Sequence, residues 1–221
     1  MKTGLTLEQL AAEITRQQSA KEDYVVNTGN LRLESYGPDL TLRVLDSDGA
    51  DRIEPLEIGD IAHRQIGTHL SIPAKYYERM RSEDPGLLAH NVNTWLERTP
   101  AQRMIRVLDG KARAYLSNRY LRMDNYSIAS AVLPILAEIP DVRIESCQIT
   151  DSRMYIKAVN PRLQEDVTPG DTVQAGVVIS NSEVGLGSVN IQPLIYRLVC
   201  SNGMVVNDAA TKRNHIGRAT D

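Results

Sequence analysis

The sequence contains no phenylalanine, one tryptophan and two cysteines among its 221 residues. Without phenylalanine, a buried core has to be built from leucine, isoleucine, valine, methionine and alanine, with tyrosine as the main aromatic. The two cysteines, Cys147 and Cys200, are too few for the framework of several disulfides that small secreted proteins use. We therefore expect reduced, packed thiols in a cytoplasmic protein.

Long apolar runs are also missing, because no stretch approaches the roughly 20 residues that cross a membrane. The first residues, MKTGLTLEQLAAEITRQQ, carry acidic side chains at helical spacing and indicate an amphipathic helix rather than a signal peptide. A hydrophobic content of 42% and a charged content of 24% are ordinary for a globular chain. The composition thus predicts a globular protein that has no membrane partner.

Candidates for metal binding and catalysis are few. His63 and His69 are six residues apart and would leave a helix in different directions, while His90 and His215 have no cysteine or carboxylate at ligand spacing. The segment 185–187, Gly-Leu-Gly, is too short for a phosphate-binding loop. We expect no catalytic residue, no metal and no cofactor, and therefore no enzyme. A metal-dependent nuclease is the low-ranked alternative, since the acidic pairs of the sequence fall in turns.

Helical spacing and short alternating runs follow one another along the chain without an internal repeat. The predicted fold class is α+β, with antiparallel β-hairpins and a sheet on which several short helices pack. A single domain over 1–221 accounts for this order, and a helical and hairpin subdomain over 1–100 with a β-rich core over 101–221 is the alternative. We expect helices over 6–18, 58–70, 74–80, 86–97 and 126–139, strands over 24–33, 40–45, 142–150, 153–159, 172–180 and 188–200, and a loop over 160–170.

The most informative segment is RMIRVLDGKARAYLSNRYLRMDN, residues 103–125, which is basic in a mildly acidic chain. Seven Arg or Lys and two acidic residues lie between positions 97 and 122, whereas the whole chain has a net charge of −3. Asp109-Gly110 is a strong two-residue turn signal, so the segment predicts a β-hairpin. Pairing outward from the turn places Arg106 opposite Arg113. Two arginines in that position repel each other unless an anion or a carboxylate lies between them.

On this register the hairpin has one face suited to a core and one cationic face. The core face carries Ile105, Val107, Ala112 and Ala114, and the other carries Met104, Arg106, Lys111, Arg113 and Tyr115. Arginine beside tyrosine is a combination that holds phosphates and stacks bases of a single strand. The alternative is a solvated edge whose arginines pair with carboxylates elsewhere in the fold. The predicted nucleic-acid contacts are Arg106, Lys111, Arg113, Arg119 and Arg122 for phosphates, and Tyr115 and Tyr120 for stacking.

A second candidate is the phrase QIGTHLSIPAKYYERM at 65–80, which has the spacing of a helix-turn-helix. If this element reads DNA, the side chains that face the major groove are Ala74, Lys75, Tyr76 and Arg79. Many pairs of helices satisfy the same spacing without binding DNA. A purely structural pair of helices is therefore the alternative.

Three phrases resemble those of a protein family carried by phages and plasmids and catalogued as domain of unknown function 932. They are LSNRY followed by MDN over 116–125, SNSEVG over 180–185 and YRLVCSNGM over 196–204. The likeness runs from about Ile58 to the end of the chain. It implies a mobile-element protein in the cytoplasm of a bacterial host, with no settled activity, cofactor or catalytic residue. Members often continue beyond a segment like 215–218, so the resemblance also implies a C-terminal portion beyond this chain.

The basic hairpin and this resemblance together lead to a functional hypothesis. We expect a non-enzymatic nucleic-acid-binding protein of phage or plasmid DNA metabolism, with single-stranded DNA as the favoured partner, single-strand binding or annealing as the role, and self-association into an oligomer. The charges of residues 101–221, 14 basic and 12 acidic, favour this partner. The alternative is a host-directed or counter-defence factor that binds a host or phage protein and no nucleic acid. The 16 acidic and 11 basic residues of positions 1–100 favour that alternative.

Overall fold

The computed structural model describes residues 4–167, 172–197, 204–205 and 211–213. Within these ranges the fold is α+β, with helices packed on largely antiparallel sheets, as predicted. The described residues form two compact units. Residues 20–120 form one, which we call the inserted unit, and residues 4–19 with those from 121 onward form the other, the outer unit. Among the helices of the described ranges, none is long and apolar enough to cross a membrane.

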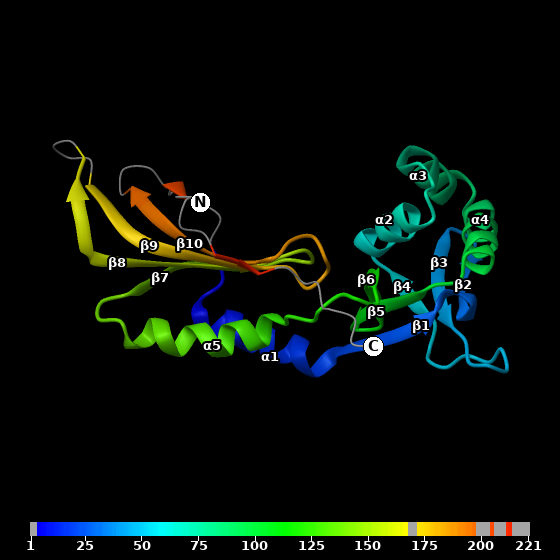
Figure 1. Ribbon diagram of the computed structural model, residues 1–221, viewed down its shortest axis with the longest axis horizontal. Coiled ribbons are helices and arrows are strands. Elements are labelled where there is room, and N and C mark those ends of the chain that lie inside the picture. Colours follow the sequence, from blue (N-terminus) through cyan, green and yellow to red (C-terminus); the bar gives the residue numbers. More distant parts are fainter. Residues whose placement is uncertain (1–3, 168–171, 198–203, 206–210, 214–221) are drawn as a thin grey trace. The chain divides into compact units, whose positions relative to one another are not determined.

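The inserted unit is a six-stranded sheet with helices on one side (Figure 1). Its strands have the spatial order β1-β5-β6-β4-β3-β2, and all neighbours are antiparallel except β4 and β6. The strands are β1 (Lys21–Asn27), β2 (Leu31–Tyr36), β3 (Asp39–Val44), β4 (Leu56–Ile58), β5 (Gln102–Leu108) and β6 (Lys111–Ser117). The helices are the short 3-10 helix η1 (Thr28–Asn30), α2 (Asp60–His69), α3 (Ala74–Glu83) and α4 (Pro85–Arg98).

The edge strands of this sheet, β1 and β2, are joined only by the three residues of η1. Because three residues span only a short distance, the end of β1 lies close to the start of β2. The sheet is therefore curved, with its two edge strands near each other where η1 joins them. Helix α2 packs on β6 and α4 packs on β2, and the core between them is aliphatic with the two buried rings of Tyr77 and Tyr115. Strands β5 and β6, which the sequence grouped with the second half of the chain, lie in this unit with residues 20–101.

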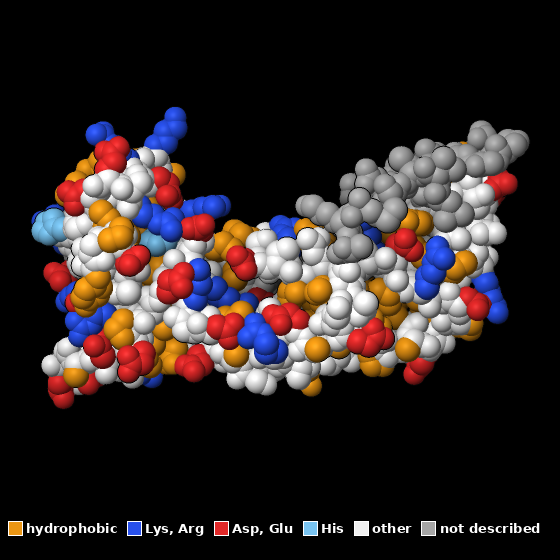
Figure 2. Space-filling view, turned by 180° about the vertical axis from the view of Figure 1, so that it is seen from behind, with side chains coloured by type: hydrophobic (Ala, Val, Ile, Leu, Met, Phe, Trp, Pro, Cys, Tyr) orange, Lys and Arg blue, Asp and Glu red, His pale blue; other side chains and the backbone are white. Residues whose placement is uncertain are grey.

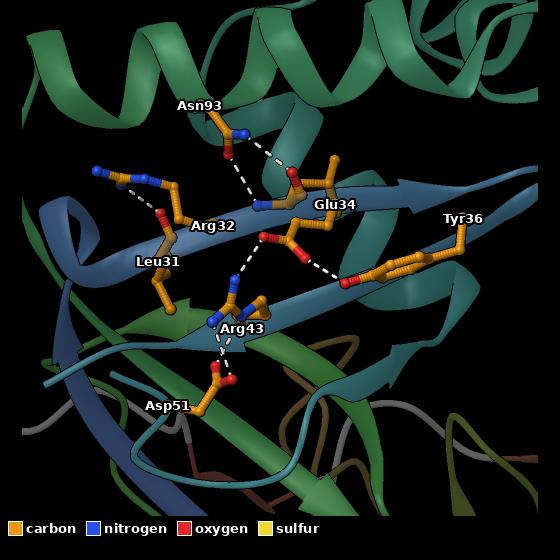
Figure 3. A network of polar contacts seen from close by, with 8 residues as sticks. Leu31, Arg32, Glu34, Tyr36, Arg43, Asp51 and Asn93 are labelled. Carbon is orange, nitrogen blue, oxygen red and sulfur yellow. Dashed lines mark hydrogen bonds and ion pairs between the residues drawn. The ribbon is translucent and has the colours of Figure 1, made fainter. Parts of the chain in front are cut away.

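Strand β2 lies at an edge of the sheet, and polar side chains bind the backbone groups that would otherwise face a further strand (Figure 3). The Leu33 N–H donates to Asn93 Oδ1 at 2.8 Å, and Asn93 Nδ2 donates to the Leu33 carbonyl at 2.9 Å. Two residues earlier, the Arg32 guanidinium donates to the Leu31 carbonyl at 2.8 Å. Asn93 belongs to α4, so this helix closes the β2 edge against pairing with another chain.

Arg43 on β3 ties β2 to the loop that follows β3 (Figure 3). Its guanidinium donates to both Asp51 oxygens at 2.7 and 2.9 Å and to Glu34 Oε1 at 2.6 Å. The hydrogen bond from Arg43 holds the pKa of Asp51 below its usual value, and those from Tyr36 and then Arg43 do the same for Glu34. Both carboxyl groups therefore stay ionised to a lower pH than ordinary side chains of their type.

The outer unit is an antiparallel sheet with α1 and α5 on one face (Figure 1). Its strands have the order β11-β10-β9-β8-β7, and β12 also pairs with β10. The leucine, isoleucine and methionine side chains of that face form the core with the two helices. The elements are α1 (Leu7–Ala20), α5 (Asn125–Glu138), β7 (Arg143–Ile149), β8 (Met154–Asp166), β9 (Thr172–Asn181), β10 (Val189–Arg197), β11 (Met204–Val205) and β12 (Thr211–Arg213).

The two helices of the outer unit begin in different ways. Thr6 and Gln9 form a reciprocal capping box, because the Gln9 N–H donates to Thr6 Oγ1 at 3.2 Å and the Thr6 N–H donates to Gln9 Oε1 at 2.9 Å. At α5, the residue before the helix, Asp124, makes no side-chain cap. The buried carboxylate of Glu183 accepts from the Asn125 N–H at 2.6 Å instead. A negative charge at this end also suits the helix dipole.

The cap on α5 brings together two of the phrases singled out in the sequence, MDN over 123–125 and SNSEVG over 180–185. Asn181 Nδ2 donates to the Met123 carbonyl and to Asn125 Oδ1, each at 2.9 Å. Asn125, Asn181 and Glu183 are 6%, 1% and 6% exposed. Buried polar groups are tolerated when they are hydrogen-bonded, so this cluster fixes the start of α5 on the loop after β9.

Two predicted elements are wrong. The single strand expected over 24–33 is two strands, β1 and β2, because Asn27 Oδ1 accepts from the Gly29 N–H and turns the chain at η1. The loop expected over 160–170 is strand as far as Asp166, since β8 pairs with β9 on both sides of a bulge between Asn160 and Gln164. Cys147 is a buried free thiol, as predicted. Cys200 and His215 lie outside the described residues.

Candidate nucleic-acid interface

The basic segment forms the predicted hairpin, in which β5 and β6 are joined at Asp109-Gly110. These two residues have φ values of 52° and 73°. Positive φ at both positions is the backbone of a type I′ turn, which favours Asp-Gly. The predicted register is confirmed for the two pairs nearest the turn, Leu108 with Lys111 and Val107 with Ala112.

Beyond these pairs the predicted register is wrong, because a β-bulge follows Ala112. Arg106 lies opposite Ala114, and Arg113 is the extra residue that the bulge adds to β6. The expected repulsion between Arg106 and Arg113, and the anion inferred from it, therefore do not apply. The bulge also reverses the faces that follow it. Tyr115 comes to the core face, opposite Ile105, while Ala114 comes to the other face.

Arg106 is a predicted phosphate contact that the structure places in the protein interior. Its side chain is 0% exposed, and its Nε and Nη2 donate to the two oxygens of Asp23 at 2.8 and 3.1 Å. Asp23 lies directly opposite on β1. A guanidinium that is buried against a carboxylate does not reach a nucleic-acid phosphate. We therefore correct the role of Arg106 from ligand contact to part of a buried ion pair.

Tyr115 is also buried, with 3% exposure, and its ring is not available to stack on a base. Its hydroxyl lies 2.8 Å from His69 Nδ1, and its backbone N–H donates to Gln65 Oε1 at 2.7 Å. The Arg103 guanidinium lies over the Tyr115 ring, 5.6 Å from its centroid. Burial, and then the positive charge of Arg103, keep the pKa of His69 below its usual value. Tyr115 thus holds a neutral histidine and a cation in place at the end of α2.

Lys111 and Arg113 lie nearer the turn of the hairpin. Lys111 Nζ is 2.6 Å from Glu57 Oε1 on the neighbouring strand β4, and the two side chains are 45% and 69% exposed. An exposed pair of this kind contributes little to stability. Arg113 is half-buried. The alternative interpretation of the hairpin, in which its cations pair with carboxylates of the fold, therefore describes Arg106 and Lys111 better than phosphate binding does.

The chain leaves β6 through a turn around Ser117. The Arg119 N–H donates to Ser117 Oγ at 3.2 Å, and the Tyr120 N–H donates to the Ser117 carbonyl at 3.0 Å. The Arg119 side chain is exposed, and that of Tyr120 is half-buried. Arg122 is exposed and belongs to the outer unit. Of the predicted contacts, Arg119 and Arg122 are thus the two that the structure leaves exposed.

Two cations at the open end of the hairpin, Arg103 and Arg119, form the remaining candidate contact surface, and we call them the hairpin-end cations. Arg103 lies directly opposite Ser117, and Arg119 follows in the turn. In the described part of the chain, no carboxylate pairs with either guanidinium, and the buried Nε of Arg103 has no hydrogen-bond partner. Sequence reasoning missed Arg103. The feature of the sequence that could have drawn attention to Arg103 is the alternation of side chains along the strand, which places it on the same face as Ile105 and Val107.

The helix pair at 65–80 forms as the spacing predicted. Helices α2 and α3 are in contact, and a Cβ at Gly67 would lie 2.9 Å from the Tyr77 ring, so the absent side chain permits this close packing. The α3 residues assigned to the major groove, Ala74, Lys75, Tyr76 and Arg79, are all exposed. Two acidic residues, Glu78 and Glu83, are exposed on the same helix, and Glu83 lies 2.9 Å from Arg79. This mixed charge is unfavourable for a helix that lies against phosphates.

The two histidines of α2 bind different tyrosines. His63 Nδ1 lies 2.9 Å from the Tyr77 hydroxyl, whereas His69 Nδ1 lies 2.8 Å from the Tyr115 hydroxyl. Burial, and then Arg81, lower the pKa of His63 to about 4, so that it is neutral at pH 7. Within the described ranges, no three His, Cys, Asp or Glu side chains come together in a way that could hold a metal ion.

Charge is finely mixed on the face of the molecule seen in Figure 2. Lys and Arg side chains lie among Asp and Glu side chains over the described surface, rather than in one extended basic patch. The net charge of −3 agrees with this distribution. A nucleic acid on such a surface would have few phosphate contacts, and its affinity would depend only modestly on salt.

Comparison with known proteins gives a match to a family model. Residues 114–221 match the family model described as Domain of unknown function (DUF932). This match includes the three phrases that carried the resemblance, and it begins at residue 114 rather than near Ile58. Part of the third phrase, 198–203, lies outside the described residues. Neither the search of curated proteins nor the search of solved structures gave a match.

Proposed function

Because the family that residues 114–221 match, domain of unknown function 932, has a description that states no activity, we propose a function from the site itself. The chain is a non-enzymatic protein that binds single-stranded nucleic acid, and the hairpin-end cations hold its phosphates. The observation that carries this proposal is the pair Arg103 and Arg119, which no described carboxylate neutralises at the open end of the hairpin. The setting that we propose, phage or plasmid DNA metabolism, rests on the family resemblance.

The state of Arg103 supports a role in binding. The Tyr115 ring fixes the position of its guanidinium, and His69 beside it adds no second charge while it stays neutral. A preorganised guanidinium loses less side-chain freedom when it binds a phosphate than a freely moving one. Its planar group can also lie against a base. These features suit a flexible single strand, whose bases are accessible.

Recognition of double-stranded DNA by α3 is the less favoured form of the proposal. An element that enters the major groove presents cations and amides to base edges while its flanks contact phosphates. On α3 the exposed Arg79 is engaged with Glu83, and Glu78 adds a further negative charge. Annealing of complementary strands would extend the proposed function, since it requires several copies along one strand. That step rests on analogy between folds.

Replacing both hairpin-end cations by alanine is expected to weaken binding of single-stranded DNA and to reduce its salt dependence. Each phosphate contact on a single strand contributes about 0.7 to the slope of log K against log salt, so losing two lowers the slope by about 1.4. Fluorescence anisotropy of a labelled oligothymidylate, measured across a salt series, gives both quantities. Arg52→Ala is the matched control, because Arg52 is an exposed arginine of the same unit. A double variant with the affinity and slope of the wild type would remove these residues from the proposal.

A second candidate function, binding of a host or phage protein, is favoured by one observation on α5. The exposed side chains of this helix include Tyr126 at 42% and Ile135 at 60% exposure, and Glu138 is its sole charged residue. A helix with so little charge on its outer face is typical of one that is covered by another molecule. This candidate requires a stable protein complex, and it requires no affinity for nucleic acid.

A further inference from the structure

The last residue of α2, His69, contacts the same tyrosine ring as Arg103. His69 Nδ1 lies 2.8 Å from the Tyr115 hydroxyl, and the centroids of these two rings are 5.5 Å apart. The Arg103 guanidinium lies 5.6 Å from the centroid of the Tyr115 ring. A hydrogen bond from the Tyr115 backbone to Gln65, one turn earlier on α2, fixes this part of β6 against the helix. One buried tyrosine thus holds a histidine and an arginine near each other.

His69 and Arg103 each have a nitrogen that no described group binds. The second ring nitrogen of His69, Nε2, has no partner within the described ranges, and it remains accessible to solvent. Arg103 Nε is buried and likewise lacks a partner there. A buried N–H without an acceptor is costly, and an oxygen of a bound anion would satisfy it. The two side chains therefore offer donors to one anionic ligand.

The surroundings of His69 keep its ring uncharged in the free chain. It faces the Tyr115 hydroxyl from β6 and the Arg103 guanidinium from β5, while the α3 side chain packed on α2 is the neutral ring of Tyr77. Burial, and then the positive charge of Arg103, lower the pKa of His69. At pH 7 the ring is neutral, and its charged form is opposed by the same cation that attracts a phosphate.

We propose that His69 is a second ligand for the phosphate that Arg103 holds, and that its ring takes up a proton from solvent when the nucleic acid binds. In the charged ring both nitrogens carry a proton. Nε2 donates to the phosphate, and Nδ1 donates to the Tyr115 oxygen, because a tyrosine hydroxyl can accept as well as donate. A phosphate beside both cations offsets their repulsion and favours the charged ring. The proposed function supplies the ligand on which this role of His69 rests.

Proton uptake makes the affinity depend on pH. The pKa of His69 is below its usual value in the free chain, and a bound phosphate raises it. Above both pKa values the ring is neutral in the free and the bound chain, so pH has no effect. Between them only the bound chain holds the proton, and the affinity rises as the pH falls, by up to about tenfold for each pH unit. Single-stranded DNA is therefore expected to bind about tenfold more tightly at pH 5.5 than at pH 7.

The test measures fluorescence anisotropy of a labelled oligothymidylate with the full chain at pH 7 and at pH 5.5. His69→Gln is expected to lose most of the gain in affinity at the lower pH. Tyr115→Phe keeps the buried ring but removes the acceptor for Nδ1, and it is expected to reduce the gain. His90→Gln is the matched control, because His90 is an exposed histidine of the same unit, and it is expected to keep the gain.

Proton NMR of the wild-type chain measures the protonation itself. The imidazole resonance of His69, identified by its loss in His69→Gln, is expected to titrate about one pH unit higher when oligothymidylate is bound, in line with tenfold tighter binding. If the wild-type chain binds equally at both pH values and this resonance titrates at the same pH with and without DNA, the role of His69 is refuted while the proposed function stands. If the wild-type chain does not bind oligothymidylate, both are refuted together.

Discussion

Replacing Arg106 by alanine is expected to lower the free energy of unfolding of the inserted unit by about 3–5 kcal/mol. The variant leaves the Asp23 carboxylate without its guanidinium at a position where the two side chains are 9% and 0% exposed. A buried charge that loses its partner costs far more than an exposed one. Urea unfolding followed through the fluorescence of Trp95 measures the change, because this single tryptophan lies on α4 of the inserted unit.

Two further variants separate this explanation from a general effect of losing an arginine. Arg119→Ala removes an exposed cation and is expected to change the stability by no more than about 0.5 kcal/mol. Replacing Asp23 and Arg106 together by leucine and methionine removes both charges and is expected to recover most of the loss. An Arg106→Ala variant with the unfolding midpoint of the wild type would contradict the buried ion pair.

Lowering the pH from 7 to 4 is expected to destabilise the inserted unit by about 3 kcal/mol through His63 alone. The pKa of this histidine is about 4 in the folded chain, against 6.5 in the unfolded chain, and each unit of difference corresponds to about 1.4 kcal/mol. Above pH 6.5 the side chain is neutral in both states and has no effect. Between pH 6.5 and 4 the unfolded chain binds the proton and the folded chain does not, so stability falls as the pH falls.

Between pH 6.5 and 5, the effect of His63 on stability can be separated from that of the carboxyl groups. The pKa values of Glu34 and Asp51 are held below their usual values, so these groups stay ionised throughout this interval. The slope of the urea midpoint against pH, measured at pH 7, 6 and 5, is expected to be much smaller for His63→Gln than for the wild type. Burial of His69, which lowers the pKa of that side chain, accounts for the slope that remains. His90→Gln, at an exposed position on α4, should keep the slope. An unchanged slope in His63→Gln would refute the assignment.

The sequence predicted those parts of the fold that depend on local signals. The Asp-Gly turn determined the hairpin and its first two pairs, and helical spacing predicted α2, α3, α4 and α5 within a few residues. The bulge at Arg113 has no local signal. It brings Tyr115 rather than Ala114 under α2, where the tyrosine contacts His69 from 46 residues away in the chain. A contact of that range decides the register, and one sequence does not show it.

The candidate site was predictable only in part, for the same reason. Arg106 looks like a solvent-facing cation because its partner Asp23 lies 83 residues earlier. Its burial follows from the pairing of β1 with β5, which alternation within the hairpin does not reveal. Glu183 caps α5 from 58 residues away, and no local signal in the sequence reveals a partner at that distance. Arg119, which the sequence predicts as a phosphate contact, is exposed because it follows the end of a strand, where local sequence decides exposure. Its contact with a phosphate stays a prediction.

Binding of the wild-type chain to labelled single-stranded and double-stranded DNA, measured from about 50 to 200 mM salt, tests the central claim most directly. We expect micromolar or tighter binding of the single strand, weaker binding of the duplex, and an affinity that falls modestly as salt rises. No binding of either form at low salt would contradict it and would favour a protein partner on α5. Tighter binding of the duplex would instead favour recognition by α3.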